Sequence, residues 1–356
     1  MSSAIWVIGN GQLGQMLRQA GEPLGLAVYP KRFDEPLARL PETAVVTTEI
    51  EQWPNTSTTS LLSHHPGFAN LSAIQQLADR YRQKQLLDTL QLPTAPWVLL
   101  RSVDQWSDLF TKWGEPLVVK CRQGGYDGRG QWRVYRGEQQ LPDTLYGQAI
   151  VEAYMPFDTE CSIIGARSRQ GDIVCYPLTY NYHQAGILCA SVAFPEPESP
   201  LQSLAEQLLR TVMQHFDYRG VLAIECFVIK GKLLINELAP RVHNSGHWTQ
   251  TGASISQFSL HLRALCDWPM PQPMVSQPSV MLNLIGNSFN PQWLAHPLVQ
   301  LYWYGKAVRP GRKLGHINFS HLDKNILQSV LYDLQTQLSD EAYSNSLQWL
   351  QQKLSH

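Results

Sequence analysis

A predicted β-hairpin over residues 221–239, followed directly by a run of polar residues, constrains this chain most. Its apolar stretches, Val221 to Ile229 and Leu233 to Leu238, flank Lys230-Gly231-Lys232, a sequence typical of a tight turn. The run from Ile235 to His247 then carries a carboxylate, a guanidinium, two imidazoles and two amides. The end of a strand that opens into a loop is where α/β proteins place reacting groups, so we expect a functional site there.

Two carboxylates face each other across this hairpin if Gly231 is its centre. Residues equally far from Gly231 are then opposite, which pairs Glu225 with Glu237 and Phe227 with Ile235. Opposite side chains lie about 5 Å apart at Cβ, so two acids would repel and raise each other's pKa unless a cation joins them. Magnesium prefers a few carboxylates plus phosphate oxygens, and Phe227 on the same face could hold a nucleobase. The alternative is two solvated acids on an outward face, and a one-residue shift in register would separate them.

A glycine-rich loop follows the buried strand predicted over Leu117 to Lys120. Four of the seven residues from 124 to 130 are glycine, so the loop is mobile and its amides can wrap phosphates. It lacks the Gly-Lys-Ser/Thr of a Walker A loop, and Gln131 to Val134 read as a returning strand. We therefore expect a hairpin flap with Lys120 at its base, because a buried ammonium needs an anion. A flexible surface hairpin is the alternative.

The N-terminus carries a second glycine motif, Gly9-x-Gly11-x-x-Gly14, between a predicted strand and a predicted helix. Glycines let the backbone approach an anion, and a helix N-terminus favours negative charge. A nicotinamide site would also need an acid at the end of the second strand, but residues 29–32 read Tyr-Pro-Lys-Arg there. A different phosphate-bearing ligand is therefore favoured, and a bland tight turn is the alternative.

Two cationic segments complete the set of motifs. Arg241 suits forked recognition of a planar oxyanion such as bicarbonate. His243 and His247 follow it, and each could be a base or only a structural donor. The segment from Lys306 to Lys313 has four cations around a Pro-Gly turn, which fits a sugar phosphate, with a solvated basic turn as the alternative.

Composition excludes several classes of partner. The chain has 356 residues, a formal net charge of −1 and 16% charged residues, so nothing attracts it generally to nucleic acid or to an anionic membrane. It has no run of about 18 apolar residues that predicts a membrane span, and its N-terminus lacks the regions of a secretion signal. Its six cysteines form no Cys-x-x-Cys pair, which favours reduced thiols in a cytoplasmic protein.

Proline-rich breaks predict three domains. Pro93 and Pro96 follow a helix predicted over Ile74 to Leu90, and Pro269 to Pro273 read as a linker. The predicted domains cover residues 1–95, 96–268 and 269–356. Further predicted strands are Ala4 to Ile8, Leu26 to Tyr29, Val45 to Thr48, Ala149 to Ala153, Val280 to Ile285 and Leu301 to Tyr304, and further helices lie over 201–216 and 324–337.

The order of these motifs resembles the ATP-grasp superfamily: a lysine, a glycine-rich flap, an acidic hinge and paired metal carboxylates. Within it, four segments resemble the N5-carboxyaminoimidazole ribonucleotide synthetase family: Gly9 to Gly14, Gly124 to Gln131, Asn236 to Thr249 and Arg309 to His316. The resemblance covers nearly the whole chain. It implies an α/β (α+β ATP-grasp) fold, with an N-terminal Rossmann-like parallel-sheet domain, a central ATP-grasp domain of two subdomains and a small C-terminal β-rich domain.

The resemblance also implies roles for individual residues. Catalysis would involve Arg241, His243, Asn244 and Lys120. Magnesium, or manganese in its place, would be held by Glu225 and Glu237. ATP would be bound by Arg80, Lys120, the flap Gly125, Tyr126, Asp127, Gly128, Arg129, Gly130 and Gln131, the hinge Glu152, Ala153, Tyr154 and Met155, and by Glu160, His183, Phe227, Asn236 and Glu237. Aminoimidazole ribonucleotide would meet Gly11, Gln12, Leu13, Tyr126, Asp127, Arg129, Lys306 and Arg312.

The implied reaction is the carboxylation of aminoimidazole ribonucleotide by bicarbonate in purine biosynthesis. ATP would activate bicarbonate as carboxyphosphate, and ADP and phosphate would be released. The family also implies a homodimer. Three other functions stay open: another ATP-grasp ligase, such as a formate-dependent glycinamide ribonucleotide transformylase or a biotin carboxylase; a nicotinamide-dependent oxidoreductase built on Gly9 to Gly14; and a non-catalytic nucleotide-binding module.

Overall fold

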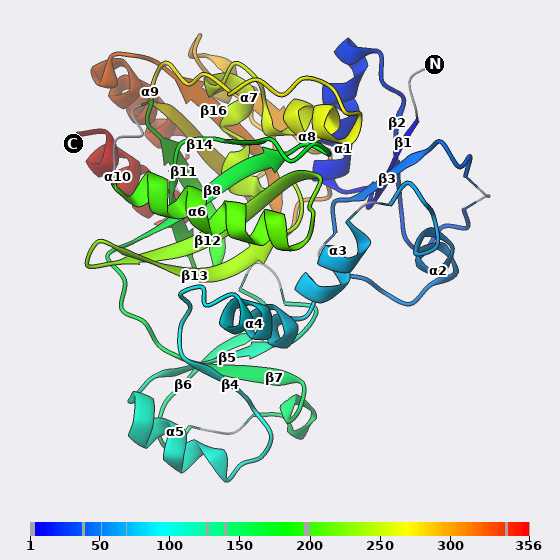
Figure 1. The fold of residues 1–356 in the computed structure, drawn as a ribbon. Helices are drawn as coiled ribbons and strands as arrows, with labels where there is room; N and C mark the ends of the chain where they lie inside the picture. The colour runs from blue at the N-terminus through cyan, green and yellow to red at the C-terminus, as the bar shows by residue number, and fades with distance from the viewer. Residues whose placement is uncertain are drawn as a thin grey trace.

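Three β-sheets organise the protein, and each packs against its own helices (Figure 1). The computed structural model describes residues 4–37, 40–50, 52–68, 70–125, 128–138, 141–195, 200–338 and 341–355. In Figure 1 the small sheet, in cyan, lies below the large sheet, and the N-terminal sheet, in blue, lies to its right. Any site between these three units therefore combines segments that are far apart in the sequence.

The N-terminal sheet is parallel, with the strand order β2-β1-β3. Its strands are β1 (Ile5–Ile8), β2 (Val28–Lys31) and β3 (Val45–Thr48), and β2 begins two residues later than predicted. This parallel order confirms the Rossmann-like prediction for the unit. Its helical segments are α1 (Gln12–Gly21), η1 (Glu22–Leu24), α2 (Ser57–Leu62) and α3 (Leu71–Leu77).

The small sheet is antiparallel, with the order β4-β7-β5-β6. It consists of β4 (Trp97–Leu99), β5 (Leu117–Cys121), β6 (Gln131–Val134) and β7 (Ala149–Ala153), and it packs with α4 (Arg80–Thr89), α5 (Gln105–Trp113) and η2 (Asp143–Leu145). The single helix predicted over 74–90 is wrong: it is divided into α3 and α4. The first helix ends at Leu77, and Asp79 caps the second, because its carboxylate accepts a hydrogen bond from the Tyr81 amide at 2.9 Å.

The large sheet has nine strands and combines the predicted central and C-terminal domains. Its order is β13-β12-β8-β10-β11-β14-β16-β15, with β9 paired to β8. The strands before the proline-rich linker are β8 (Thr159–Arg167), β9 (Ile173–Cys175), β10 (Thr179–Gln184), β11 (Ile187–Ala193), β12 (Gly220–Ile229) and β13 (Lys232–Ala239). Those after it are β14 (Ser279–Ile285), β15 (Gln300–Trp303) and β16 (Lys313–Ser320). Because β14 pairs with β11, the C-terminal strands extend the same sheet.

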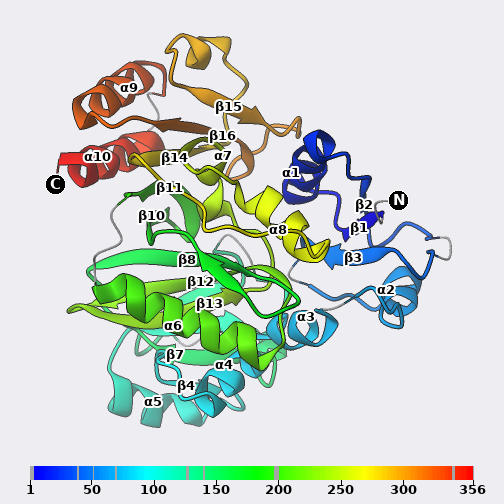
Figure 2. The same cartoon turned by 45° about the horizontal axis from the view of Figure 1, so that its top comes forward.

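Helices cover both faces of the large sheet (Figure 2). One face packs against α6 (Pro200–His215), and the other packs against α8 (Gln257–Leu265), which also contacts α1. The C-terminal part is covered by α9 (Lys324–Gln337) and α10 (Glu341–Ser355); short helical segments are η3 (Asn244–Gly246), α7 (Thr249–Gly252) and η4 (Pro291–Leu294). Among the described helices, none combines the length and apolar content that a membrane crossing requires.

The alternating side chains of β12 fix the position of the acidic face. Leu222, Ile224, Cys226 and Val228 are buried in the cluster that contains α6. The opposite face starts with the buried side chains of Val221 and Ala223 and continues with Glu225 and Phe227, which are only partly buried. A shift by one residue would exchange the two faces, and each buried aliphatic side chain contributes about 1.5–3 kcal/mol. The apolar pattern therefore determines which way the acids point.

Candidate active site

The hairpin brings its two acids together as direct partners. Glu225 on β12 lies opposite Glu237 on β13, which confirms the predicted pair. Between the acids and the turn the predicted register is wrong, because Phe227 pairs with Leu234 and not with Ile235. The two strands are thus offset by one residue near the turn and return to the predicted register at the acids.

A two-residue turn and a β-bulge explain this offset. Lys230 and Gly231 both have positive φ, 48° and 72°, as a type I′ turn requires, so the centre of the hairpin lies between them. The register then shifts between the Glu225 and Cys226 pairs, where Asn236 has no partner across the ladder. Such a bulge turns an extra side chain out of the ladder. Here it directs Asn236 to Lys120, whose Nζ donates to Asn236 Oδ1 at 2.9 Å.

Lys120 belongs to a buried group of three charges. Its Nζ lies 2.7 Å from Glu152 Oε2, and Lys84 Nζ lies 2.6 Å from Glu152 Oε1. Burial alone would raise the pKa of Glu152, but the positive charges of Lys120 and Lys84 lower it to about 2. Burial lowers the pKa of Lys84, and Glu152 opposes this effect. The Glu152 carboxylate of the predicted hinge is therefore held between two lysines, one of which, Lys84, sequence reasoning did not assign to the site.

Arg80 joins the flap to the acid pair. Its Nη2 donates to Gly125 O at 2.8 Å, and its Nη1 donates to Cys121 O at 3.1 Å. The same Nη2 lies 3.5 Å from Glu237 Oε2. Arg80 is the first residue of α4 and lies beside the base of the flap. It therefore contacts both the flap backbone and the Glu237 carboxylate. The predicted flap residues Tyr126 and Asp127 lie outside the described residues.

The far side of the flap rests on the turn between β10 and β11. A Cβ added to Gly128 would lie 2.3 Å from the carbonyl oxygen of Ala185, and Gly128 has φ +74°. Only glycine satisfies both conditions without strain. The strand Gln131–Val134 returns from the flap as predicted, with Gln131 opposite Lys120.

Glu160, His183 and Glu225 meet beside the acid pair. His183 Nδ1 lies 2.9 Å from Glu160 Oε2, and its Nε2 lies 3.9 Å from Glu225 Oε1. Burial would lower the pKa of His183, but the hydrogen bond with Glu160 and the charges of both acids raise it. Burial raises the pKa of Glu225; His183 opposes this, and Glu237 adds to it. The two carboxylates therefore repel each other at the predicted metal position.

The polar run after β13 supplies Arg241, His243 and Asn244. His243 Nε2 lies 3.4 Å from Glu225 Oε1. Burial lowers the pKa of His243 well below its ordinary value, and the charge of Arg241 lowers it further. Burial also lowers the pKa of Arg241 to about 10, partly offset by Glu49. The Asn244 amide exchanges two hydrogen bonds with Asn283, at 3.1 and 2.8 Å, which ties this loop to β14.

Aromatic side chains lie at the other end of the acidic face. The Phe227 and Phe157 rings stack with centroids 4.6 Å apart and an interplanar angle of 7°. The guanidinium of Arg133 lies over the ring of the hinge residue Tyr154, 5.2 Å from its centroid. Ala153 is buried in β7. This end of the face is therefore flat and apolar, as a nucleobase requires.

The N-terminal glycine motif binds a carboxylate of its own chain. Glu49, directly after β3, accepts hydrogen bonds from the Gly11 amide and, at 2.7 Å, from the Gly14 amide. A Cβ on Gly9 would lie 2.2 Å from Glu49 Cγ. The carboxylate thus lies at the N-terminus of α1, where a dinucleotide would place its pyrophosphate. This arrangement rules against the nicotinamide interpretation.

Sequence reasoning missed Glu49 because it looked for an acid only after the second strand. An acid directly after the third strand of the same parallel sheet was the available signal, since the carboxyl ends of parallel strands share one edge.

The predicted substrate loops meet at this end of α1. Lys306 Nζ donates to Gln12 Oε1 across 294 positions of sequence, and it also lies 5.3 Å from the Tyr304 ring centroid. Arg312 Nη1 donates to Ala307 O at 3.1 Å and so holds the basic turn together. Leu13 is buried in the hydrophobic core and so anchors α1.

The acid pair suits a cation that keeps other ligands. Among the described residues, no three His, Cys, Asp or Glu side chains are arranged to hold a metal ion by themselves. Glu225 and Glu237 nevertheless carry a mutual repulsion that a divalent cation would remove. Two carboxylates with space for water and phosphate oxygens fit magnesium, which seldom takes an all-protein shell.

Comparison with known proteins now identifies the family. A model described as "ATP-grasp domain" matches residues 85–258, and one described as "Phosphoribosylaminoimidazole carboxylase C-terminal domain" matches residues 279–329. N5-carboxyaminoimidazole ribonucleotide synthase from Escherichia coli is 54% identical over 351 residues, which is 98% of this chain and 99% of that protein. The chain belongs to the N5-carboxyaminoimidazole ribonucleotide synthase family.

Solved structures of family members agree with the fold. The crystal structure of the Thermus thermophilus synthetase has a TM-score of 0.82 and 36% identity, covering 93% of this chain and 98% of that one. The Aspergillus clavatus synthase in complex with ADP and 5-aminoimidazole ribonucleotide has a TM-score of 0.80 and 25% identity, covering 93% and 96%. The protein is thus an ATP-dependent enzyme with the ATP-grasp fold that makes N5-carboxyaminoimidazole ribonucleotide in purine biosynthesis.

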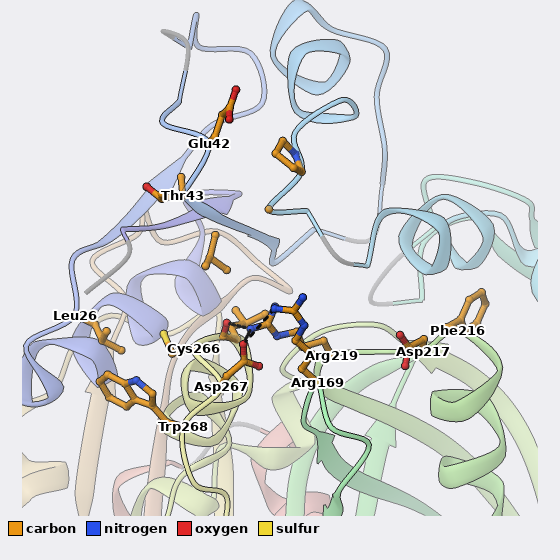
Figure 3. Close-up of a pocket in the computed structure, with 15 residues that line it drawn as sticks. Leu26, Glu42, Thr43, Arg169, Phe216, Asp217, Arg219, Cys266, Asp267 and Trp268 are labelled. Carbon is orange, nitrogen blue, oxygen red and sulfur yellow. Dashed lines mark hydrogen bonds and ion pairs between the residues drawn. The ribbon is translucent and has the colours of Figure 1, made fainter. Parts of the chain in front are cut away.

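One cavity of this synthase lies apart from the acid pair. It has a volume of about 610 Å³ and lies between the N-terminal sheet and the end of α8 (Figure 3). Arg219 and Asp267 form an ion pair of 2.7 Å on its wall, and Arg219 also donates to the carbonyl oxygens of Ala264 and Leu265. Arg219 thus serves mainly to join α8 to β12. None of the residues that line this cavity is one of the predicted site residues.

Proposed function

We propose that the Glu225–Glu237 pair is the place where the family reaction, the ATP- and bicarbonate-dependent carboxylation of aminoimidazole ribonucleotide, takes place. The observation that carries the proposal is the position of this pair. Arg80 lies 3.5 Å from Glu237, Lys120 binds the neighbouring Asn236, and His243 lies 3.4 Å from Glu225. A phosphoryl group needs cations on one side and an acceptor on the other, and the residues around this pair offer both.

On the nucleotide side, the residues position phosphates and the base. Lys120 and Arg80 would contact the phosphates, and the flap would close over them and exclude water. Phe227 and the hinge from Glu152 to Met155 would enclose the adenine, and Glu160 would accept from the ribose. Magnesium bound to Glu225 and Glu237 would neutralise charge on the phosphate oxygens. Asn236 would keep the Lys120 ammonium beside them.

On the acceptor side, Arg241 and His243 would bind bicarbonate. Bicarbonate is a poor electrophile, so its oxygen must first be phosphorylated; the carboxyphosphate formed then delivers carbon dioxide to the substrate amine. Arg241 can hold the planar oxyanion with a forked pair of hydrogen bonds. Both carboxyphosphate and the carbamate product hydrolyse readily, which explains the value of a closing flap.

Aminoimidazole ribonucleotide would lie between the N-terminal unit and the basic turn. Lys306 and Arg312 would bind its phosphate, with the Gly11-Gln12-Leu13 loop beside them. The Glu49 carboxylate, buried among the glycines, is placed to accept from a sugar hydroxyl. The flap residues Tyr126, Asp127 and Arg129 remain proposed contacts of the imidazole end. A cytoplasmic homodimer is the proposed state, and sedimentation velocity would measure the assembly.

Phosphate release from ATP tests the proposal. Release should require bicarbonate and rise strongly when aminoimidazole ribonucleotide is added. No response to aminoimidazole ribonucleotide, or an equal response to glycinamide ribonucleotide with formate or to biotin, would favour another ATP-grasp ligase. Glu237→Gln should lower kcat by about 100-fold or more, since it removes one metal carboxylate, whereas Glu138→Gln at an exposed position should leave kcat unchanged.

A further inference from the structure

A chain of buried polar side chains runs through the large sheet and ends at His243. Its members are Ser191 on β11, Asn181 on β10, Ser162 on β8 and Ser245 in η3. The three serines are 0% exposed and Asn181 is 2% exposed. Burying four polar groups in a sheet core is costly unless every one of them is paired. None of the four was predicted to belong to the site.

The distances along this chain are those of good hydrogen bonds. Ser191 Oγ donates to Asn181 Oδ1 at 2.8 Å, and Asn181 Nδ2 donates to Ser162 Oγ at 3.0 Å. Ser162 Oγ lies 2.7 Å from Ser245 Oγ, which lies 2.8 Å from His243 Nδ1. Each step therefore links one side chain to the next without a gap.

The direction of the chain follows from counting protons. A serine hydroxyl has one proton to donate. Ser162 Oγ accepts from Asn181, and among the described residues Ser245 Oγ is the one acceptor within reach of its own proton, so that proton goes to Ser245 and the proton of Ser245 goes to His243 Nδ1. The end of the chain gives the same answer independently: the Ser245 backbone amide donates to His243 Nδ1 at 3.3 Å, and an amide N–H can only donate. His243 Nδ1 is thus an acceptor, which leaves the ring proton on Nε2.

We propose that this series of hydrogen bonds holds His243 in the Nε2–H tautomer. His243 then donates a hydrogen bond at the acid pair and does not take a proton there. Ser245 and Ser162 are then positioning residues that act through His243. The Nε2 atom lies 3.4 Å from Glu225 Oε1, so its proton faces the place where the reacting oxygens would bind. The role of this donor in catalysis rests on the proposed function; the tautomer itself does not.

The first test measures the tautomer directly. In the full-length protein with ¹⁵N-labelled histidine, two-bond ¹⁵N–¹H spectra distinguish an unprotonated Nδ1 from a protonated one. The His243 signals are assigned by their loss in His243→Asn. We expect an unprotonated Nδ1 and a protonated Nε2 in the wild-type protein without substrates. A protonated Nδ1 would overturn the proposal, whatever the enzyme's activity, so its failure can be told apart from failure of the proposed function.

The second test interrupts the series of hydrogen bonds by removing one serine hydroxyl at a time. In Ser245→Ala and Ser162→Ala we expect the Nδ1 signal to move toward a tautomer mixture, and kcat/KM for bicarbonate to fall about tenfold with little change in ADP affinity. Ser279→Ala is the matched control, because Ser279 is a buried β14 serine whose Oγ donates only to Gln277 O at 3.0 Å. If both variants match this control in spectrum and kinetics, the chain has no positioning role. If either fails to fold, the wild-type spectrum still decides.

Discussion

Removing Lys84 should weaken both the fold and ATP binding, because Lys84 shares the Glu152 carboxylate with Lys120 and so leaves a net positive charge at this site. Glu152 lies 2.6 Å from Lys84 Nζ and 2.7 Å from Lys120 Nζ, so the three side chains carry one net positive charge. Without Lys84 the carboxylate would neutralise Lys120 instead. Lys84 Nζ also donates to Thr94 Oγ1 at 2.5 Å, and Thr94 in turn donates to Ile235 O at 2.8 Å beside the bulge.

The size of the effect follows from burial. The Lys84 and Glu152 side chains are only 3% and 5% exposed, so solvent does little to screen them. Two charges about 4 Å apart interact by about 4 kcal/mol at an effective dielectric constant of about 20, and breaking a buried pair typically costs about 3–5 kcal/mol. Lys120 still compensates Glu152 in Lys84→Met, which favours the low end. We expect a loss of about 3 kcal/mol in the free energy of unfolding and about tenfold weaker ADP binding.

A double-mutant cycle separates this charge effect from simple loss of packing. Urea unfolding and ADP titration calorimetry are run on Lys84→Met, Glu152→Gln and the double variant. The double variant should recover ADP affinity relative to Lys84→Met, since Lys120 then has no carboxylate to neutralise it. A coupling between the two sites below about 0.5 kcal/mol, with no recovery of ADP affinity, would refute the reasoning.

Three further predictions follow from the same contacts. The pKa of Glu152 is about 2 against an ordinary value of 4.5, so its contribution of about 3 kcal/mol is present above pH 4.5 and lost as pH falls toward 2; wild type should lose more stability than Glu152→Gln over that window in urea titrations. Gly128→Ala should lower kcat about tenfold or more by pushing the flap off Ala185, whereas Gly137→Ala, which has φ +91° and open space, should cost only stability. Glu49→Ala should lose two hydrogen bonds to the glycine motif and about 1–3 kcal/mol in chemical unfolding, and an unchanged midpoint would contradict that role.

Local patterns made most of the elements predictable, whereas contacts between segments that are distant in the sequence could not be predicted from them. The alternation along β12 indicated which face carries the acids, and the assumed centre at Gly231 gave the acid pair although the turn itself is offset. The strands before and after the flap, β5 and β6, could also be predicted from their local sequence pattern. Glu49 and Lys84 were missed because their partners lie 35 to 68 positions away in the sequence, although each pair belongs to a single unit. The break between α3 and α4 depends on a single N-cap residue, Asp79. The apolar pattern continues across this break and therefore predicts one helix. Where sequence reasoning implied a contact across units, as between Gln12 and Lys306, it drew on family resemblance.

The hairpin shows why the acid pair was predictable although the turn was not. A two-residue turn at Lys230 and Gly231 shifts the ladder by one residue from the predicted centre, and the bulge at Asn236 shifts it back. In a regular strand Asn236 and Glu237 would point to opposite faces. With the bulge, Asn236 meets Lys120 while Glu237 lies 3.5 Å from Arg80, and both of these cations belong to the small-sheet unit. One extra residue therefore lets two consecutive side chains both contact the small-sheet unit, so the departure from a regular hairpin is itself part of the proposed site.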